Sequence, residues 1–249
     1  MKYFKYIFLI FIVVFSFIYT KRVVDYAEVN NVILSSINEY ALEYDKKCVE
    51  GSINEYGVIL SFSGKLVDKN KSYSNMKGGI FNEGLIEYKK DECILNKEDN
   101  YDKYILRGNV ISNNISLVID VINKKNYQNM IDIFDKYNLD SNLLVNDSFD
   151  DSADFLLYKG NNIIDFKKKY EKFYCTGEII DECSKEKINT IRIMNYVDDN
   201  LFLNIKKFLN NGNIIFIKES SSNLNELEIV INYIKSRGFN IVNIDELLS

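Results

Sequence analysis

Apolar residues follow two different patterns over the first 46 residues of the chain. Residues 6–20 read YIFLIFIVVFSFIYT and carry no charge; two lysines precede this run, and Lys21 and Arg22 follow it. Beyond it, apolar residues recur mostly at steps of three and four, at Tyr26, Val29, Ile33, Ile37, Tyr40, Ala41 and Tyr44. That spacing predicts an amphipathic helix over about residues 24–46, either a stalk or a helix packed on its own domain.

The uncharged run is typical of a membrane-spanning helix. Its 15 residues would rise about 22 Å as a helix, which is short of the ~30 Å hydrocarbon core of a bilayer. A snorkelling Lys5 and the following Val23 and Val24 extend it. We therefore expect an uncleaved transmembrane anchor over residues 1–22, with a cleaved signal peptide and a core helix as alternatives. Cleavage needs small residues at alternate positions, and Val14-Phe15-Ser16 fits this poorly.

Residues 48–112 form a segment interrupted by glycines. The short runs 58–62, 80–88 and 104–111 are typical of strands. We expect a small strand-rich module here, so that residues 23–112 contain the amphipathic helix and this module.

From about residue 114, short apolar runs alternate with helical periods. The pattern predicts strands at 115–120, 142–145, 162–164, 190–194, 213–217 and 239–244. It predicts helices at 126–137, 200–209 and 224–237, and a closing helical turn at 245–248. Strand, helix and strand in repetition indicate an α/β fold with a parallel sheet or barrel. The main domain is expected to span residues 113–249.

Composition restricts the chemistry open to the chain. The 249 residues are 47% hydrophobic and 27% charged, as in ordinary globular proteins. The net charge of -5 provides no basic field, so nucleic acid is not an expected partner. The chain has no histidine, which excludes Ser-His-Asp and Cys-His arrangements and His-containing zinc sites. Drift in an AT-rich genome is the alternative reason for this absence, but it explains only the loss of dispensable histidines.

The four cysteines fall in two pairs, Cys48 with Cys93 and Cys175 with Cys183, one in each half of the chain. An even number is compatible with disulfides in an exported protein. Of the three connectivities we favour these two pairs; four reduced, buried thiols are the alternative. A four-cysteine zinc site is not expected, because it would normally show closely spaced C-x-x-C pairs.

Two segments carry a resemblance to a known family. The C-terminal run NGNIIFIKESSSNLNELEIVINYIKSRGFNIVNIDELLS and the earlier run ISLVIDVINKKNYQNMIDIFDKYNLDSNLLV resemble the end and the opening of a polysaccharide deacetylase (NodB-homology) domain. The resemblance covers about residues 112–249 and implies a deacetylase-like (β/α) barrel-type domain. In that family, one Asp and two His hold a divalent metal, a neighbouring Asp is the general base, and a late His is the general acid.

The catalytic motifs of the family are largely absent from this chain. By the resemblance, Asp120 matches the general base, but Val121 stands in place of the metal-binding Asp. Phe166 and Tyr170 fall roughly where the two histidines would be, and Lys218 stands at the late histidine. We expect no metal and no cofactor, or a divalent metal if the site is active after all. We hypothesise an ion pair between Lys218 and Asp120; the alternatives are a solvated aspartate at a turn and an exposed loop lysine.

Together these features predict a single-pass membrane protein with the bulk of its chain outside the cytoplasm. Two basic residues flank the apolar run on each side, so their distribution sets no orientation, and export rests partly on the resemblance. The expected function is a deacetylase-like protein that has lost catalysis and binds a cell-envelope glycan, such as a cell-wall or surface polysaccharide, or a protein partner. The alternatives are an active carbohydrate deacetylase, which hydrolyses N-acetyl C–N bonds, with an atypical site, and a structural envelope protein without glycan affinity.

Overall fold

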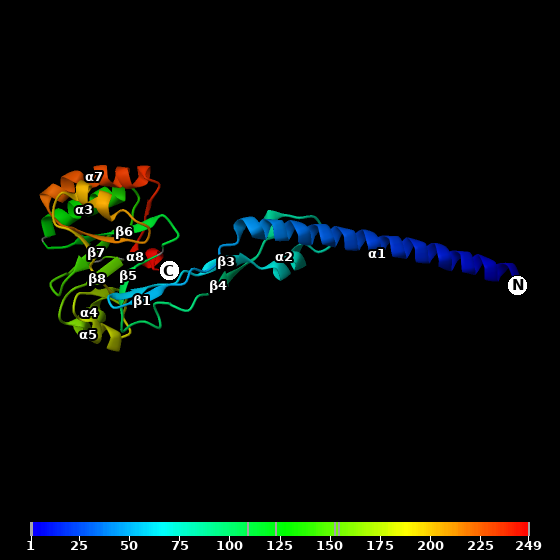
Figure 1. Ribbon diagram of the computed structural model, residues 1–249, viewed down its shortest axis with the longest axis horizontal. Helices are drawn as coiled ribbons and strands as arrows, with labels where there is room; N and C mark the ends of the chain where they lie inside the picture. The colour runs from blue at the N-terminus through cyan, green and yellow to red at the C-terminus, as the bar shows by residue number, and fades with distance from the viewer. Residues whose placement is uncertain (1, 109, 123, 152, 154, 249) are drawn as a thin grey trace. The chain divides into compact units, whose positions relative to one another are not determined.

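The computed structural model describes residues 2–108, 110–122, 124–151, 153 and 155–248. The chain forms two compact units (Figure 1). The N-terminal unit consists of Met1–Cys48 and Ser63–Glu92, and the larger unit consists of Val49–Phe62 and Cys93–Ser249. These units differ from the expected division at residues 22 and 112. The reason is that strands from 49–62 and 93–112 pair into the same sheet as strands of the main domain.

The N-terminal unit is built on one continuous helix, α1 (Lys2–Tyr44). The apolar run and the amphipathic stripe join without a break, because no glycine or proline occurs before residue 51. Its other elements are β3 (Gly64–Val67), α2 (Lys69–Met76), the 3-10 helix η1 (Glu83–Leu85) and β4 (Tyr88–Asp91), and β3 and β4 pair antiparallel. The core of the unit is formed by Ile33, Ile37 and Ala41 of α1 with Val67 and Met76. The amphipathic stripe therefore packs on its own unit.

The larger unit is a curled mixed sheet, or half-barrel. Its strands follow the order β1-β2-β5-β10-β9-β8-β7-β6-β12-β11. Among the described residues, β1–β2 is antiparallel and the other neighbours in this order are parallel. The strands are β1 (Ser52–Asn54), β2 (Gly57–Ile59), β5 (Tyr104–Arg107), β6 (Asn114–Asp120), β7 (Asn142–Val145), β8 (Phe155–Tyr158), β9 (Tyr174–Thr176), β10 (Thr190–Ile191), β11 (Asn195–Val197), β12 (Ile214–Lys218) and β13 (Asn240–Ile241), which pairs with β6.

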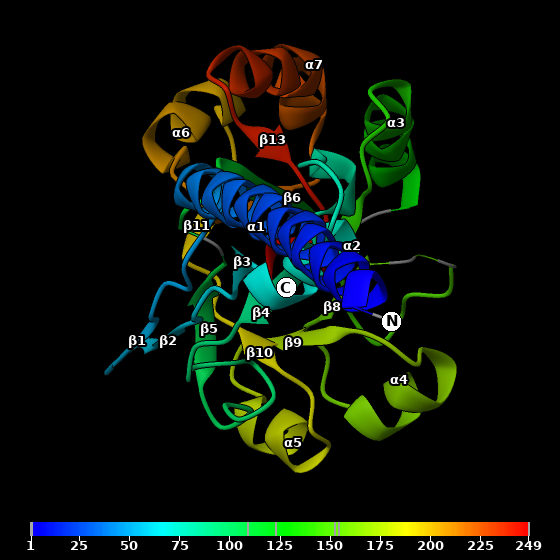
Figure 2. The same ribbon diagram turned by 90° about the vertical axis from the view of Figure 1, so that its right-hand side faces the viewer.

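Helices surround this sheet, as Figure 2 shows for α3 to α7. They are α3 (Lys124–Lys136), α4 (Ile163–Lys169), α5 (Ile180–Lys185), α6 (Leu201–Phe208), α7 (Ser221–Ser236) and the closing α8 (Ile244–Leu247). Parallel strands buried on both faces read as continuous apolar runs, and ISLVID and IIFIK do so.

Alternation along the strands divides the buried side chains into two cores. The outer core, under the helices, contains Ile119 and Ile217 together with Phe134 of α3 and Ile231 of α7. The inner core, on the opposite face of the sheet, contains Val118, Leu144, Leu157 and Phe216 with Ile244 and Leu247 of α8. Whether a residue at a strand end faces the inner or the outer side therefore follows from its position in this alternation.

Most predicted elements of the main domain are present, but some predictions are wrong. Residues 162–164 do not form a strand: Asn162 caps the N-terminus of α4, and its Oδ1 accepts a hydrogen bond from the backbone N–H of Asp165 at 3.3 Å. The predicted strand at 80–88 is replaced by irregular backbone around η1, with only Tyr88 belonging to β4. Strands β8, β9 and β11 and helix α5, each six residues or shorter, were not predicted.

Candidate functional site

Asp120 lies at the carboxyl edge of the sheet, as the last residue of β6. Ile119 faces the outer core and Val118 the inner core, so Asp120 points to the inner side. The residue is only 5% exposed. A buried carboxylate needs charged or hydrogen-bonding partners. Two are present: Lys159 Nζ forms an ion pair with Oδ1, and the Tyr196 hydroxyl donates a hydrogen bond to Oδ2 at 2.8 Å.

Both partners come from neighbouring parts of the same edge. Lys159 directly follows β8, and Tyr196 is the middle residue of β11. Val197 faces the outer core, so Tyr196 faces the inner side, as Asp120 does. Burial, together with the hydrogen bond to Asp120, raises the pKa of the Tyr196 hydroxyl above its ordinary value. Tyr196 therefore stays protonated and acts as a hydrogen-bond donor.

Lys218 is the last residue of β12 and lies in direct register with Asp120 on β6. Its ammonium group nevertheless forms an ion pair with Asp198, in the loop after β11. This hydrogen bond raises the pKa of Lys218, and Asp120 contributes more weakly through its charge. The hypothesised ion pair between Lys218 and Asp120 is therefore not formed: Lys159 is the cation bound to Asp120.

Val121 takes part in packing rather than in a polar site. Its backbone N–H donates to the carbonyl of Leu144 at 2.9 Å, and its side chain packs against the outer core. It also lines a pocket of about 50 Å³ together with Tyr127 and Asn146. A space of this size is sufficient for a water molecule or two.

Phe166 and Tyr170 do not lie beside Asp120. Phe166 is in α4 and belongs to the outer core, where its ring stacks on Tyr158 at 4.2 Å between centroids and meets Phe173 edge-on at 4.9 Å. The Tyr170 hydroxyl donates to the backbone carbonyl of Asp151 at 3.0 Å. These residues pack α4 against the sheet, and their match to the family's two histidines stays a prediction of the resemblance.

The side chains around Asp120 do not fit a divalent metal. A hard cation needs several oxygen or nitrogen ligands. Among the residues that the structure describes, no group of three or more carboxylate or thiol ligands includes Asp120. The carboxylate is paired with the Lys159 ammonium, and the next residue in the chain, Val121, is apolar.

Glu219 is a residue of this edge that the sequence did not single out. It is 6% exposed and follows Lys218 directly. Its carboxylate accepts backbone hydrogen bonds from Ile122 at 3.1 Å and from Asn126 at 3.2 Å. Glu219 therefore binds the backbone at Ile122 and in the first turn of α3. The signal in the sequence that could have identified Glu219 was its position as a charged residue directly after an apolar strand.

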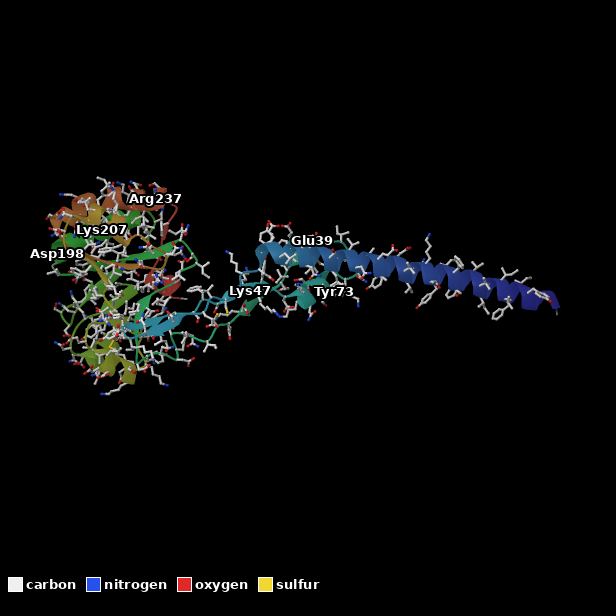
Figure 3. The ribbon with its side chains drawn as sticks, in the orientation of Figure 1. Glu39, Lys47, Tyr73, Asp198, Lys207 and Arg237 are labelled. Atoms are coloured by element: carbon white, nitrogen blue, oxygen red, sulfur yellow. A yellow bond between two sulfur atoms is a disulfide. The ribbon has the colours of Figure 1, made fainter. Side chains whose placement is uncertain are left out.

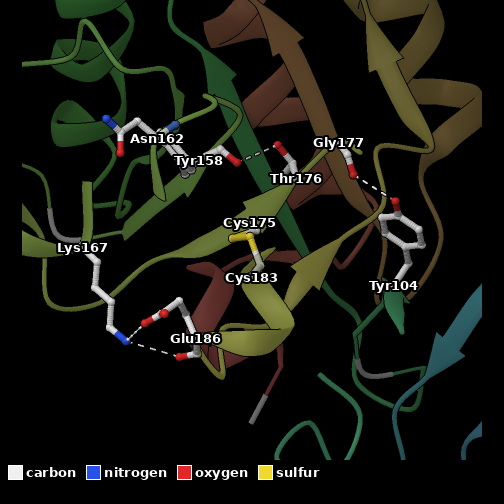
Figure 4. The surroundings of a disulfide bond; sticks show 9 residues. All are labelled: Tyr104, Tyr158, Asn162, Lys167, Cys175, Thr176, Gly177, Cys183 and Glu186. Atoms are coloured by element: carbon white, nitrogen blue, oxygen red, sulfur yellow. Dashed lines mark hydrogen bonds and ion pairs between the residues drawn. A yellow bond between two sulfur atoms is a disulfide. The ribbon is translucent and has the colours of Figure 1, made fainter. Parts of the chain in front are cut away.

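A disulfide joins Cys175 of β9 to Cys183 of α5, with a Cα–Cα distance of 6.4 Å (Figure 4). Beside it, the Thr176 hydroxyl donates to the Tyr158 carbonyl at 3.2 Å, and Lys167 pairs with Glu186 at 2.8 Å. This is one of the two pairs favoured from the sequence. Cys48 and Cys93 are also disulfide-bonded.

The fold is that of known carbohydrate esterases, although the sequences are distant. BA3943, a wild-type CE4 family pseudoenzyme from Bacillus anthracis, superposes with a TM-score of 0.63 at 18% identity, over 87% of this chain and 95% of that chain. A mutant of BA3943 with restored enzymatic activity gives a TM-score of 0.61 at 15% identity, over 87% and 98%.

A further match extends over less of this chain. PdaA from Bacillus subtilis, a family 4 carbohydrate esterase, gives a TM-score of 0.50 at 16% identity, over 61% of this chain and 86% of that chain. No model of a protein family matches the sequence, and no curated protein matches it. The structure thus matches the CE4 carbohydrate esterases, the polysaccharide deacetylases that the sequence resembles, at low sequence identity.

Proposed function

We propose that this protein is a membrane-anchored, extracytoplasmic pseudoenzyme with a CE4 fold that binds a cell-envelope glycan. The observation that carries the loss of catalysis is the ion pair between Asp120 and Lys159. An ammonium group already neutralises the carboxylate that would act as the general base. A metal would supply carbonyl polarisation and an activated water, and these residues provide no set of ligands to hold it.

Two features support a location outside the cytoplasm. Helix α1 is long and apolar enough to span a membrane, and the apolar window has none of its residues buried within the protein. The Cys175–Cys183 disulfide is typical of oxidising compartments. A membrane-anchored protein and a secreted one both fit these features; the poor cleavage site favours the anchor.

The carboxyl edge of the sheet supports the binding of a sugar polymer. Tyr196 is 38% exposed, and the side chains of Lys218 and Lys159 are 38% and 28% exposed. An aromatic ring can pack on the apolar face of a sugar, while ammonium groups donate hydrogen bonds to its hydroxyls. Ligands of open α/β sheets bind at this edge, outside the carboxyl ends of the strands.

Acetate release tests the loss of catalysis. The full chain in detergent is incubated with N-acetylated oligosaccharides and with Zn²⁺, Ni²⁺ or Co²⁺, and acetate and bound metal are measured. We expect no metal uptake at Asp120 and no release above the buffer rate. Metal-dependent acetate release that is abolished by Asp120→Asn would instead establish an active deacetylase with an atypical site.

Co-sedimentation with insoluble cell-wall glycan tests the binding role. The variant Lys218→Ala is expected to bind less glycan than the wild type. Lys207→Ala is the matched control, because Lys207 is also a surface lysine but lies in the last turn of α6. If the wild type does not sediment with glycan, this edge of the sheet binds a protein partner or the protein is structural.

A further inference from the structure

The turn that follows α2, residues 77–81 (KGGIF), exposes apolar side chains beside α1. Ile80 is 83% exposed, and Val32 on α1 is 64% exposed. Both line an apolar groove of about 490 Å³, together with Val29 and Phe81. Apolar side chains gathered in this way favour contact with a partner surface.

Contacts with α1 fix the position of this turn along the helix axis. The Gly78 backbone N–H donates to Oδ1 of Asn30 at 3.0 Å, and Asn30 is only 7% exposed. Gly78 has a φ of +79°, and a Cβ there would lie 3.0 Å from Cε2 of Tyr26, so the close approach requires glycine. The turn is therefore held against α1 between residues 26 and 30.

The same helix carries the apolar run, so its rise places the turn relative to a membrane. Residues 6–24 would span about 28 Å as a helix, close to the ~30 Å of a hydrocarbon core. The core then ends near Val24, and Asn30 lies about 9 Å beyond it. The headgroup layer on each side is roughly 5–8 Å thick, and a tilt of about 20° lowers one side of a helix further.

The direction of the turn agrees with this placement. In Figure 1 the segment after α2 reaches along α1 towards its N-terminal half. Beyond that point the side chains of α1 that the structure describes, from residue 6 on, project outwards, and no other described part of the N-terminal unit lies against them (Figure 3). The turn is thus the part of the β3–β4 segment nearest to the apolar run.

We propose that the turn 77–81 is a second membrane contact, at which Ile80 and the end of the apolar groove formed by Asp25, Glu28 and Val29 rest in the headgroup layer of a zwitterionic phospholipid bilayer. The charges at the groove suit such a headgroup. Asp25 and Glu28 line it and can pair with the amine, while the exposed Lys77 can pair with the phosphate. This inference rests on the proposed membrane anchor.

Tryptophan fluorescence can test the contact without background, because the chain contains no tryptophan. The full chain is reconstituted into phosphatidylcholine vesicles as three separate variants. Ile80→Trp reports on the turn, and Phe17→Trp, at a 79% exposed position, reports on the apolar run. Leu42→Trp is the matched control: it is 88% exposed on the same helix, but about 27 Å beyond Val24.

Two quenchers then separate the outcomes. We expect a nitroxide on the lipid headgroup to quench most of the Ile80→Trp emission and to leave Leu42→Trp emission unchanged. We expect bromines on the acyl chains to quench Phe17→Trp.

If Phe17→Trp is quenched and Ile80→Trp is not, the anchor holds and the second contact is wrong. If Leu42→Trp is quenched as strongly as Ile80→Trp, the helix lies flat and the inference fails. If Phe17→Trp is not quenched, the anchor itself fails, and the inference with it.

Discussion

Asp120 and Lys159 stand 39 residues apart and meet because β6 and β8 end at the same edge of a parallel sheet. Their pairing keeps a carboxylate buried without a metal. Lys159→Met preserves the aliphatic stem but removes the charge, leaving Asp120 with Tyr196 as its remaining side-chain partner. We expect the free energy of unfolding at pH 7 to fall by about 1–3 kcal/mol, measured by urea denaturation.

Two further variants make this result specific. Lys207→Met removes an exposed lysine on α6 and should change stability by less than about 0.5 kcal/mol. Adding Asp120→Asn to Lys159→Met should restore part of the loss, because an amide carries no uncompensated charge. Equal stability of the two lysine variants would contradict the role given to the ion pair.

The residues of this site show what the sequence could and could not predict. Asp120 and Lys218 were singled out by the resemblance to the deacetylase family, and each is the last residue of an apolar strand. Lys159 was missed because β8 was not predicted and a polar loop follows it, so nothing local distinguishes this lysine from a surface one. The partner of a buried charge is chosen by non-local strand pairing, which spacing along the chain does not encode.

At the scale of elements, the Cys175–Cys183 disulfide ties the short β9 to the short α5. Both cysteines are fully buried. Their separation of 8 residues corresponds to a loop-closure contribution of about 2–3 kcal/mol. We therefore expect the double variant Cys175→Ala/Cys183→Ala to have a free energy of unfolding that is lower by this amount. Urea denaturation should show it as a lower midpoint concentration.

The control for this variant is Ser184→Ala, which lies beside Cys183 on α5 without removing a cross-link. It should unfold within about 0.5 kcal/mol of the wild type. A cysteine variant as stable as Ser184→Ala would mean that packing of the buried side chains, rather than the cross-link, holds α5 to β9.

Elements with a long apolar pattern were the predictable ones. Strands β6 and β12 and helix α7 carry five to sixteen residues of consistent pattern, so their local preference and burial agree. Ile163 and Ile164 suggested a strand, but two apolar residues fit one turn of a helix equally well. The cap from Asn162 decided the outcome.

For the whole molecule, the balance of exposed apolar surface decides the environment of α1. Large apolar side chains from Tyr6 to Tyr19 are at least half exposed. Moving each such side chain from water into an apolar environment is favourable by about 1.5–3 kcal/mol. The described residues of the protein do not cover this surface. A bilayer provides the required apolar environment, and the backbone of α1 satisfies its own hydrogen bonds there.

This balance leads to a prediction about location. The full chain should remain in the membrane pellet after alkaline carbonate extraction, with an intact mass of 29.1 kDa. Replacing residues 1–24 by a cleavable secretion signal should release a soluble product, since the remaining chain keeps the core formed by Ile33, Ile37 and Met76.

Recovery of the unmodified chain in the soluble fraction, with a mass reduced by its N-terminal residues, would mean that the run is a cleaved signal. The Phe17→Trp variant would then lack its reporter, so the mass measurement has to precede the fluorescence test. An intact mass combined with carbonate extractability would instead mean that α1 is covered by another protein, because its apolar side chains would still need partners outside water.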